Sequence, residues 1–156
     1  MNLMHLDLEK YTLRLAPLAQ LALRFALAVP FFRSGLTKWE SFGHLSDSAI
    51  YLFQEEFRLH LFGKLVPYPF PAFMAHASGC AEILLPVLLV LGLGTRYAAL
   101  GLLAMTALIQ ITVPDGWANF HLPWAAMALA LIVWGAGPLS ADRLLTGRTA
   151  PVTKRS

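Results

Sequence analysis

Gly79-Cys-Ala-Glu82-Ile-Leu-Leu-Pro-Val-Leu-Leu-Val-Leu-Gly92 is an apolar run that carries one carboxylate in its middle. From Pro71 to Leu93, Glu82 is the only charged residue. This length suits a helix that crosses the hydrocarbon core of a bilayer, which takes about 20 residues. A charge at that depth costs several kcal/mol and is rarely left without a partner or a watery cavity. The first question about the fold is therefore which residue meets Glu82.

The composition of the whole chain is typical of an integral membrane protein. Its 156 residues are 57% apolar and 13% charged, whereas an ordinary globular domain is about 25% charged. The mean hydropathy is +0.59. Basic residues gather at the chain ends and beside apolar runs, which fits membrane topology better than nucleic-acid binding. Cys80 is the only cysteine, which excludes an internal disulfide, a CxxC redox pair and a cysteine zinc site.

Long apolar segments alternate with short turns along the chain. We predict an all-α, integral membrane four-helix bundle with spans at about residues 13–36, 71–93, 97–113 and 121–136. The bundle forms one domain over residues 1–142, and residues 143–156 form a basic cytoplasmic tail. In the first outer loop, an interfacial helix is expected from Ser46 to about Leu61. Ser46 and Asp47 are a typical helix start, and the aromatic residues nearby favour the interface.

The distribution of basic residues predicts the orientation of the bundle. With four crossings, the N-terminus, the 92–96 turn and the C-terminus share one side of the membrane. That side holds seven basic residues: Lys10, Arg14, Arg96, Arg143, Arg148, Lys154 and Arg155. The positive-inside rule then places both termini in the cytoplasm. The 37–70 loop and the 114–121 turn are expected to lie together on the outer side.

Three polar side chains are candidates for an intramembrane site. Arg24 and Glu82 each lie about eleven residues into their predicted spans, so we expect a buried Arg24–Glu82 ion pair near the midplane. The pair is either a structural staple or a proton or ligand site, and the sequence leaves both open. Arg24, Gly35 and Lys38 share one helical stripe that faces the bundle. Gln110, the strongly polar residue of the third span, is expected to hydrogen-bond across helices.

A second group of candidates lies near the outer ends of the spans. These residues could form a polar, aromatic-lined mouth, and the alternative is an ordinary interfacial belt. The group comprises Lys38, Trp39, Asp115, Trp117 and His121. The spacing of His60, His76 and His121 resembles no metal-ligand motif, so no metal site is predicted.

An ordered set of motifs runs through the chain. It comprises Phe32-Arg-Ser-Gly35-Leu-Thr-Lys38, Glu82, Gly92-Leu-Gly-Thr-Arg96 and Gly135-Ala-Gly-Pro-Leu-Ser-Ala-Asp142. From about Leu15 to Asp142, this set resembles the DoxX family of small bacterial membrane proteins. The resemblance implies a four-helix bundle in the bacterial inner membrane. It also implies a link to redox chemistry, since the family name comes from a terminal-oxidase and thiosulfate:quinone oxidoreductase context. Other members are tied to oxidative or metal stress.

Two further stretches are similar to one branch of that family. They are Tyr51-Leu-Phe-Gln-Glu-Glu-Phe57 and Pro114-Asp-Gly-Trp-Ala-Asn-Phe-His-Leu-Pro-Trp124. The branch is found beside genes for metal-binding peptides and their maturation enzymes. The resemblance supplies no established catalytic residues, and no self-contained catalytic motif identifies an enzyme.

Three functions follow as predictions. The first is an accessory subunit of a redox or metal-stress system, which contacts the lipid bilayer and docks an envelope protein on its outer face. The second is a quinone-reactive subunit of an oxidoreductase, in which Glu82, Arg24 and Gln110 protonate and hydrogen-bond a quinone headgroup. Quinone is thus the one cofactor candidate. The third is a small transporter. The sequence leaves open whether the chain forms homo-oligomers.

Overall fold

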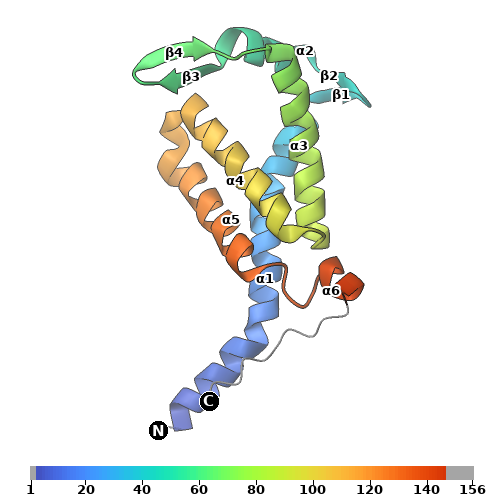
Figure 1. The fold of residues 1–156 in the computed structure, drawn as a ribbon, viewed down its shortest axis with the longest axis vertical. Coiled ribbons are helices and arrows are strands. Elements are labelled where there is room, and N and C mark those ends of the chain that lie inside the picture. Colours follow the sequence, from blue (N-terminus) through green and yellow to red (C-terminus); the bar gives the residue numbers. More distant parts are fainter. Residues whose placement is uncertain (1–2, 147–156) are drawn as a thin grey trace.

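Four long helices make up most of the structure. The computed structural model describes residues 3–146 and the side chains of residues 14–145. The long helices are α1 (Leu3–Thr37), α3 (Pro71–Leu91), α4 (Thr95–Thr112) and α5 (Leu122–Trp134). Helices α1 and α4 each pack against both α3 and α5, so the four helices close into a bundle (Figure 1). The predicted all-α membrane fold is confirmed.

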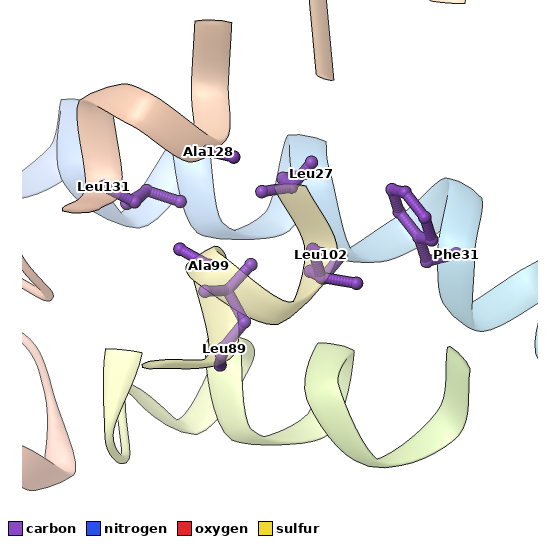
Figure 2. Packing of buried hydrophobic residues seen from close by; sticks show 9 residues of the cluster. Leu27, Phe31, Leu89, Ala99, Leu102, Ala128 and Leu131 are labelled. Carbon is purple, nitrogen blue, oxygen red and sulfur yellow. The ribbon is translucent and has the colours of Figure 1, made fainter. Parts of the chain in front are cut away.

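The core of the bundle lies where all four helices approach one another. Small side chains at Ala99 of α4 and Ala128 of α5 let the helix backbones come close, as is usual between membrane helices. Figure 2 shows these alanines among larger apolar side chains from α1, α3, α4 and α5. The labelled larger residues are Leu27, Phe31, Leu89, Leu102 and Leu131.

Among the residues that the structure describes, three helical segments are long and apolar enough to cross a membrane. They are Arg14–Thr37, Pro71–Leu91 and Pro114–Trp134. The last joins α5 to two short helical turns, η2 (Pro114–Gly116) and η3 (Trp117–His121). Large apolar side chains such as Leu84 and Val133 are exposed on the bundle surface, which suits contact with lipid. Helix α4 has 18 residues and packs between α3 and α5, and its role as a fourth span stays a prediction.

The segment between α1 and α3 holds two β-hairpins around a short helix. Its elements are β1 (Trp39–Ser41), β2 (His44–Leu45), α2 (Asp47–Tyr51), η1 (Leu52–Glu56), β3 (Arg58–Leu61) and β4 (Lys64–Pro67). Ser46 caps α2, because its side chain accepts a hydrogen bond from the Ala49 N–H at 3.3 Å. The hairpins spread over one end of the bundle, which we call the loop end (Figure 1).

The expected length of the interfacial helix is wrong. The helical residues end at Glu56, and β3 (Arg58–Leu61) occupies the rest of the segment for which the sequence predicts a helix. The reason is the two-residue turn at Phe62 and Gly63, whose φ angles are +50° and +76°. Two positive φ angles match the twist of a tight hairpin, and glycine adopts one of them without strain. Leu61 and Lys64 therefore pair across the turn.

The opposite end of the bundle is closed by a turn and a short helix, and we call it the turn end. Gly92 and Gly94 both have positive φ and join α3 to α4. Asp142 lies in the first turn of α6 (Ala141–Thr146). Its carboxylate accepts the N–H groups of Gly94 at 2.8 Å and Thr95 at 3.2 Å. Asp142 therefore caps the start of α4 and ties α6 to the turn.

Candidate functional site

Glu82 is paired with Lys38. The Lys38 Nζ lies 2.6 Å from Glu82 Oε2, and the side chains are 15% and 4% exposed. Ser78, one turn before Glu82 on α3, donates to Oε1 at 3.0 Å. Lys38 also donates to the Ser34 Oγ at 3.1 Å. The buried carboxylate is thus held by one ammonium group and one hydroxyl group.

The predicted Arg24–Glu82 ion pair is wrong. Arg24 is 1% exposed and lies at the turn end, where its Nη2 donates to the Leu139 carbonyl at 2.7 Å. The Asp142 carboxylate acts electrostatically on the same guanidinium. Gly92 lies against Arg24, since a Cβ at Gly92 would overlap Arg24 Nη1. Arg24 therefore fastens α1 to the C-terminal segment and lies outside the Glu82 site.

The offset between α1 and α3 explains this change of partner. Gly35 is the α1 residue that meets Glu82, because a Cβ at Gly35 would lie 2.9 Å from the Glu82 Cβ. Arg24, eleven residues before Gly35 on α1, lies against Gly92, ten residues after Glu82 on α3. The two helices are therefore antiparallel between these two contacts. At 1.5 Å per residue, Arg24 and Glu82 are about 16 Å apart along the bundle. Lys38, at the end of α1, lies at the depth of Glu82 instead.

A cavity of about 400 Å³ opens beside the Lys38–Glu82 pair. It lies beside the last turn of α1, between α3, α4, the loop and Trp124 of α5. Lys38, Glu82, Ser34 and Ser78 contribute its polar wall. The rest of the wall is mostly apolar and includes Phe53, Phe57, Tyr68, Met74, Met105 and Trp124. This volume falls within the range of small-molecule sites.

Tyr68 joins the loop wall of the cavity to α4. Its hydroxyl lies 2.6 Å from the Thr112 Oγ1. Thr112 donates its own hydroxyl proton to the Leu108 carbonyl at 2.8 Å, so Tyr68 is the donor to Thr112. Burial raises the pKa of the Tyr68 phenol, and the bond to Thr112 lowers that pKa by a smaller amount. The phenol therefore stays protonated at neutral pH and keeps this donor.

Gln110 hydrogen-bonds across helices, as predicted, and its partner is His121. The His121 ring is 3% exposed, and its Nδ1 lies 2.6 Å from the Gln110 Oε1. The Gln110 amide nitrogen donates to the Pro114 carbonyl at 3.3 Å, so the amide oxygen faces the ring and His121 Nδ1 carries the proton. The His121 ring also lies 5.6 Å from the Trp124 ring. This pair supports the α4–α5 packing next to the cavity wall.

The remaining outer candidates do not come together in one mouth. Trp39 lies over Gly79, where its Nε1 donates to the Gly79 carbonyl at 3.4 Å, and it covers α3 near Glu82. Asp115 and Trp117 are exposed in the turn before α5. Lys38 alone of this group contributes a charge to the cavity wall. Within residues 14–145, no cluster of His, Cys, Asp or Glu side chains is arranged to hold a metal ion.

Sequence reasoning missed three residues of the site: Ser34, Ser78 and Tyr68. Ser78 precedes Glu82 by four residues, and Ser34 precedes Lys38 by four. Residues four apart lie on the same face of a helix, so this spacing was a usable signal. Nothing comparable pointed to Tyr68, because it comes from the irregular loop before α3.

The arrangement suits a lipophilic ligand that carries a hydrogen-bond acceptor. An ammonium group has three N–H donors, and Lys38 uses two of them, on Glu82 and Ser34. The third can donate to a ligand oxygen. The aromatic and methionine side chains of the wall provide apolar contact for a ring or an alkyl chain.

Comparison with known proteins places the chain in a family. The model of the DoxX family matches residues 19–115, a range that includes Lys38, Glu82 and Gln110. An uncharacterised protein of Haemophilus influenzae is 34% identical over 137 residues, which cover 80% of this chain and 82% of that protein. No solved structure matches the chain. Neither match supports the branch beside genes for metal-binding peptides, but together they show that the chain belongs to the DoxX family.

Proposed function

We propose that this membrane protein is an accessory subunit of a redox system and binds a quinone headgroup in the cavity beside Glu82. The observation that carries the proposal is the Lys38–Glu82 pair, which is buried in the wall of an otherwise mostly apolar cavity. A quinone has a flat apolar ring with carbonyl oxygens that accept hydrogen bonds. The free N–H of Lys38 would donate to one of these oxygens, and the aromatic wall would contact the ring.

The same pair can exchange protons with such a ligand. Conversion of a quinone to a quinol takes two electrons and two protons. In this proposal a redox partner protein supplies the two electrons. Lys38 Nζ gives one proton to the ligand oxygen and regains it from water, and Glu82 Oε2 takes up a proton from water and passes it on as the second. Ser78 and Ser34 keep the two side chains in place. This role differs from the sequence-based prediction, in which Arg24, Gln110 and Glu82 together bind the quinone headgroup.

The loop end is the proposed docking face for the redox partner. The hairpin tips carry Phe42 and Phe62, and both side chains are fully exposed. Exposed aromatic side chains are enriched at protein interfaces. The proposed orientation places this face outside a bacterial inner membrane and both chain termini in the cytoplasm, in accordance with the positive-inside rule. A small transporter is a weaker proposal, because a mostly apolar wall suits a lipophilic ligand better than an ion or a polar solute.

The test is mass spectrometry of small molecules that co-purify with the protein in mild detergent. Glu82→Gln keeps the shape of the side chain and removes its charge, so the variant is expected to retain at least tenfold less quinone than the wild type. Glu40→Gln is the matched control, because Glu40 is an exposed carboxylate on β1, and it should retain quinone at the wild-type level. All samples are first checked for a single size-exclusion peak.

Two results would count against the quinone proposal. One is a well-folded wild-type protein that carries no quinone and gives no binding signal when quinone is added. The other is equal retention by the wild type and a well-folded Glu82→Gln variant, which would make Glu82 a structural residue. Either result would direct the search for function to the partner at the loop end.

A further inference from the structure

A second cavity, of about 540 Å³, lies at the turn end of the bundle. It is bordered by the start of α4, the end of α5 and the start of α6, on the opposite side of the molecule from the hairpins (Figure 1). Unlike the cavity beside Glu82, its wall contains two arginines, Arg96 and Arg143. We infer that this cavity binds the phosphate group of an anionic lipid.

The charges in the wall favour an anion. Both arginines are exposed, and Arg96 Nη2 makes a 3.3 Å hydrogen bond to the Val133 carbonyl. A guanidinium has five N–H donors, so most of those on Arg96 remain for a phosphate. Asp142 also borders the cavity, but its carboxylate already accepts the N–H groups of Gly94 and Thr95. It also acts electrostatically on the buried Arg24 guanidinium.

Two neutral polar side chains also border this cavity. Thr95 is 1% exposed and lines the cavity, and its Oγ1 has no hydrogen-bond partner among the residues that the structure describes. A buried hydroxyl without a partner is costly. Gln20 also lines the cavity and donates to the Trp134 carbonyl at 3.4 Å.

The surroundings of the cavity favour a lipid over free phosphate. Tyr97 and Trp134 border it and are 82% and 65% exposed, as is typical of aromatic residues at the membrane interface. Val133, near the end of α5, precedes the lining residue Trp134 and is 66% exposed, so it offers apolar surface for an acyl chain. Basic pockets between membrane helices on the cytoplasmic side bind acidic lipid headgroups. The positive-inside rule assigns the turn end to that side.

The experiment is native mass spectrometry of the full chain, titrated separately with phosphatidylglycerol, phosphatidylcholine and inorganic phosphate. The double variant R96Q/R143Q is expected to retain phosphatidylglycerol roughly tenfold less than the wild type, because both contacts to the phosphate are lost. The control R33Q/K64Q removes two exposed charges outside this cavity and should leave retention unchanged. R96K/R143K keeps the charges but loses the forked donors of the guanidinium, so it should retain more phosphatidylglycerol than R96Q/R143Q and less than the wild type.

Three outcomes would overturn the inference. Equal retention of phosphatidylcholine and phosphatidylglycerol would show that the headgroup charge is not recognised. Equal losses of phosphatidylglycerol in R96Q/R143Q and R33Q/K64Q would show that binding depends only on the net charge of the protein and not on this cavity. Displacement of phosphatidylglycerol by millimolar inorganic phosphate would show that the lipid is not the ligand. None of these outcomes bears on the quinone proposal, because the two cavities lie at opposite ends of the bundle.

Discussion

Lys38→Met is expected to lower the free energy of unfolding by roughly 3–5 kcal/mol, the range found when one partner of a buried ion pair is removed. The substitution keeps the length of the side chain but leaves the Glu82 carboxylate, which is 4% exposed, without an opposite charge at 2.6 Å. Ser78 still donates to Glu82, and one hydroxyl cannot replace an ammonium group. The measurement is reversible unfolding in mixed detergent micelles, followed by circular dichroism.

Two further variants test whether the loss of stability comes from the broken ion pair. The double variant Lys38→Met/Glu82→Gln removes both charges and should recover most of the lost stability, which gives a strong coupling energy in a double-mutant cycle. Lys64→Met removes an exposed lysine from β4 and should change the stability by no more than about 0.5 kcal/mol. If Lys38→Met is as stable as Lys64→Met, the Lys38–Glu82 pair does not hold α1 against α3.

Gly92→Ala is expected to destabilise the protein by roughly 2–5 kcal/mol. Gly92 has a φ of +70°, and an alanine in the left-handed region costs about 1–2 kcal/mol. The new Cβ would also overlap Arg24 Nη1 and lie 2.5 Å from the Ser140 Cβ, where overpacking costs a further 1–3 kcal/mol or so. The same unfolding measurement, together with the yield of monodisperse protein, tests this expectation.

Gly94→Ala is the matched control for the turn end. Gly94 also has a positive φ, of +57°, but a Cβ there would meet no atom within 4 Å. Only the backbone cost of about 1–2 kcal/mol is expected. A Gly94→Ala variant that is as unstable as Gly92→Ala would mean that backbone strain alone matters. The close packing of Arg24 against the turn would then have no energetic role.

The long helices could be predicted from the sequence because apolar runs of this length have few other structures in a membrane. The loop between α1 and α3 could be predicted only in part. Ser46 marked the start of a helix correctly, but the Phe62-Gly63 turn was not recognised as a hairpin signal. A Phe-Gly pair is a weaker signal than Asn-Gly, and the strands on either side are only four residues long.

The partner of Glu82 could not be predicted by counting residues from the ends of the apolar runs. That count assumes that α1 and α3 begin and end at the same depth, and the two helices are offset instead. Gly35, near the end of α1, meets Glu82 near the middle of α3. The apolar pattern locates the part of each helix that can cross the membrane, but it gives neither the start of α1 at Leu3 nor the shift of one helix along its neighbour. That shift depends on side-chain contacts such as Gly35 against Glu82 and Gly92 against Arg24.

The most direct test of the central claim, that the cavity beside Glu82 is a quinone site, is photoaffinity labelling with an azido-quinone followed by peptide mapping. The account predicts adducts on cavity-lining peptides, which include residues 53–57, 74–82 and 105–113, and loss of these adducts when excess unlabelled quinone competes. Adducts confined to the surface groove between α1 and α3, which is lined by Phe25, Val29 and Val87, would contradict it. So would labelling that unlabelled quinone fails to reduce.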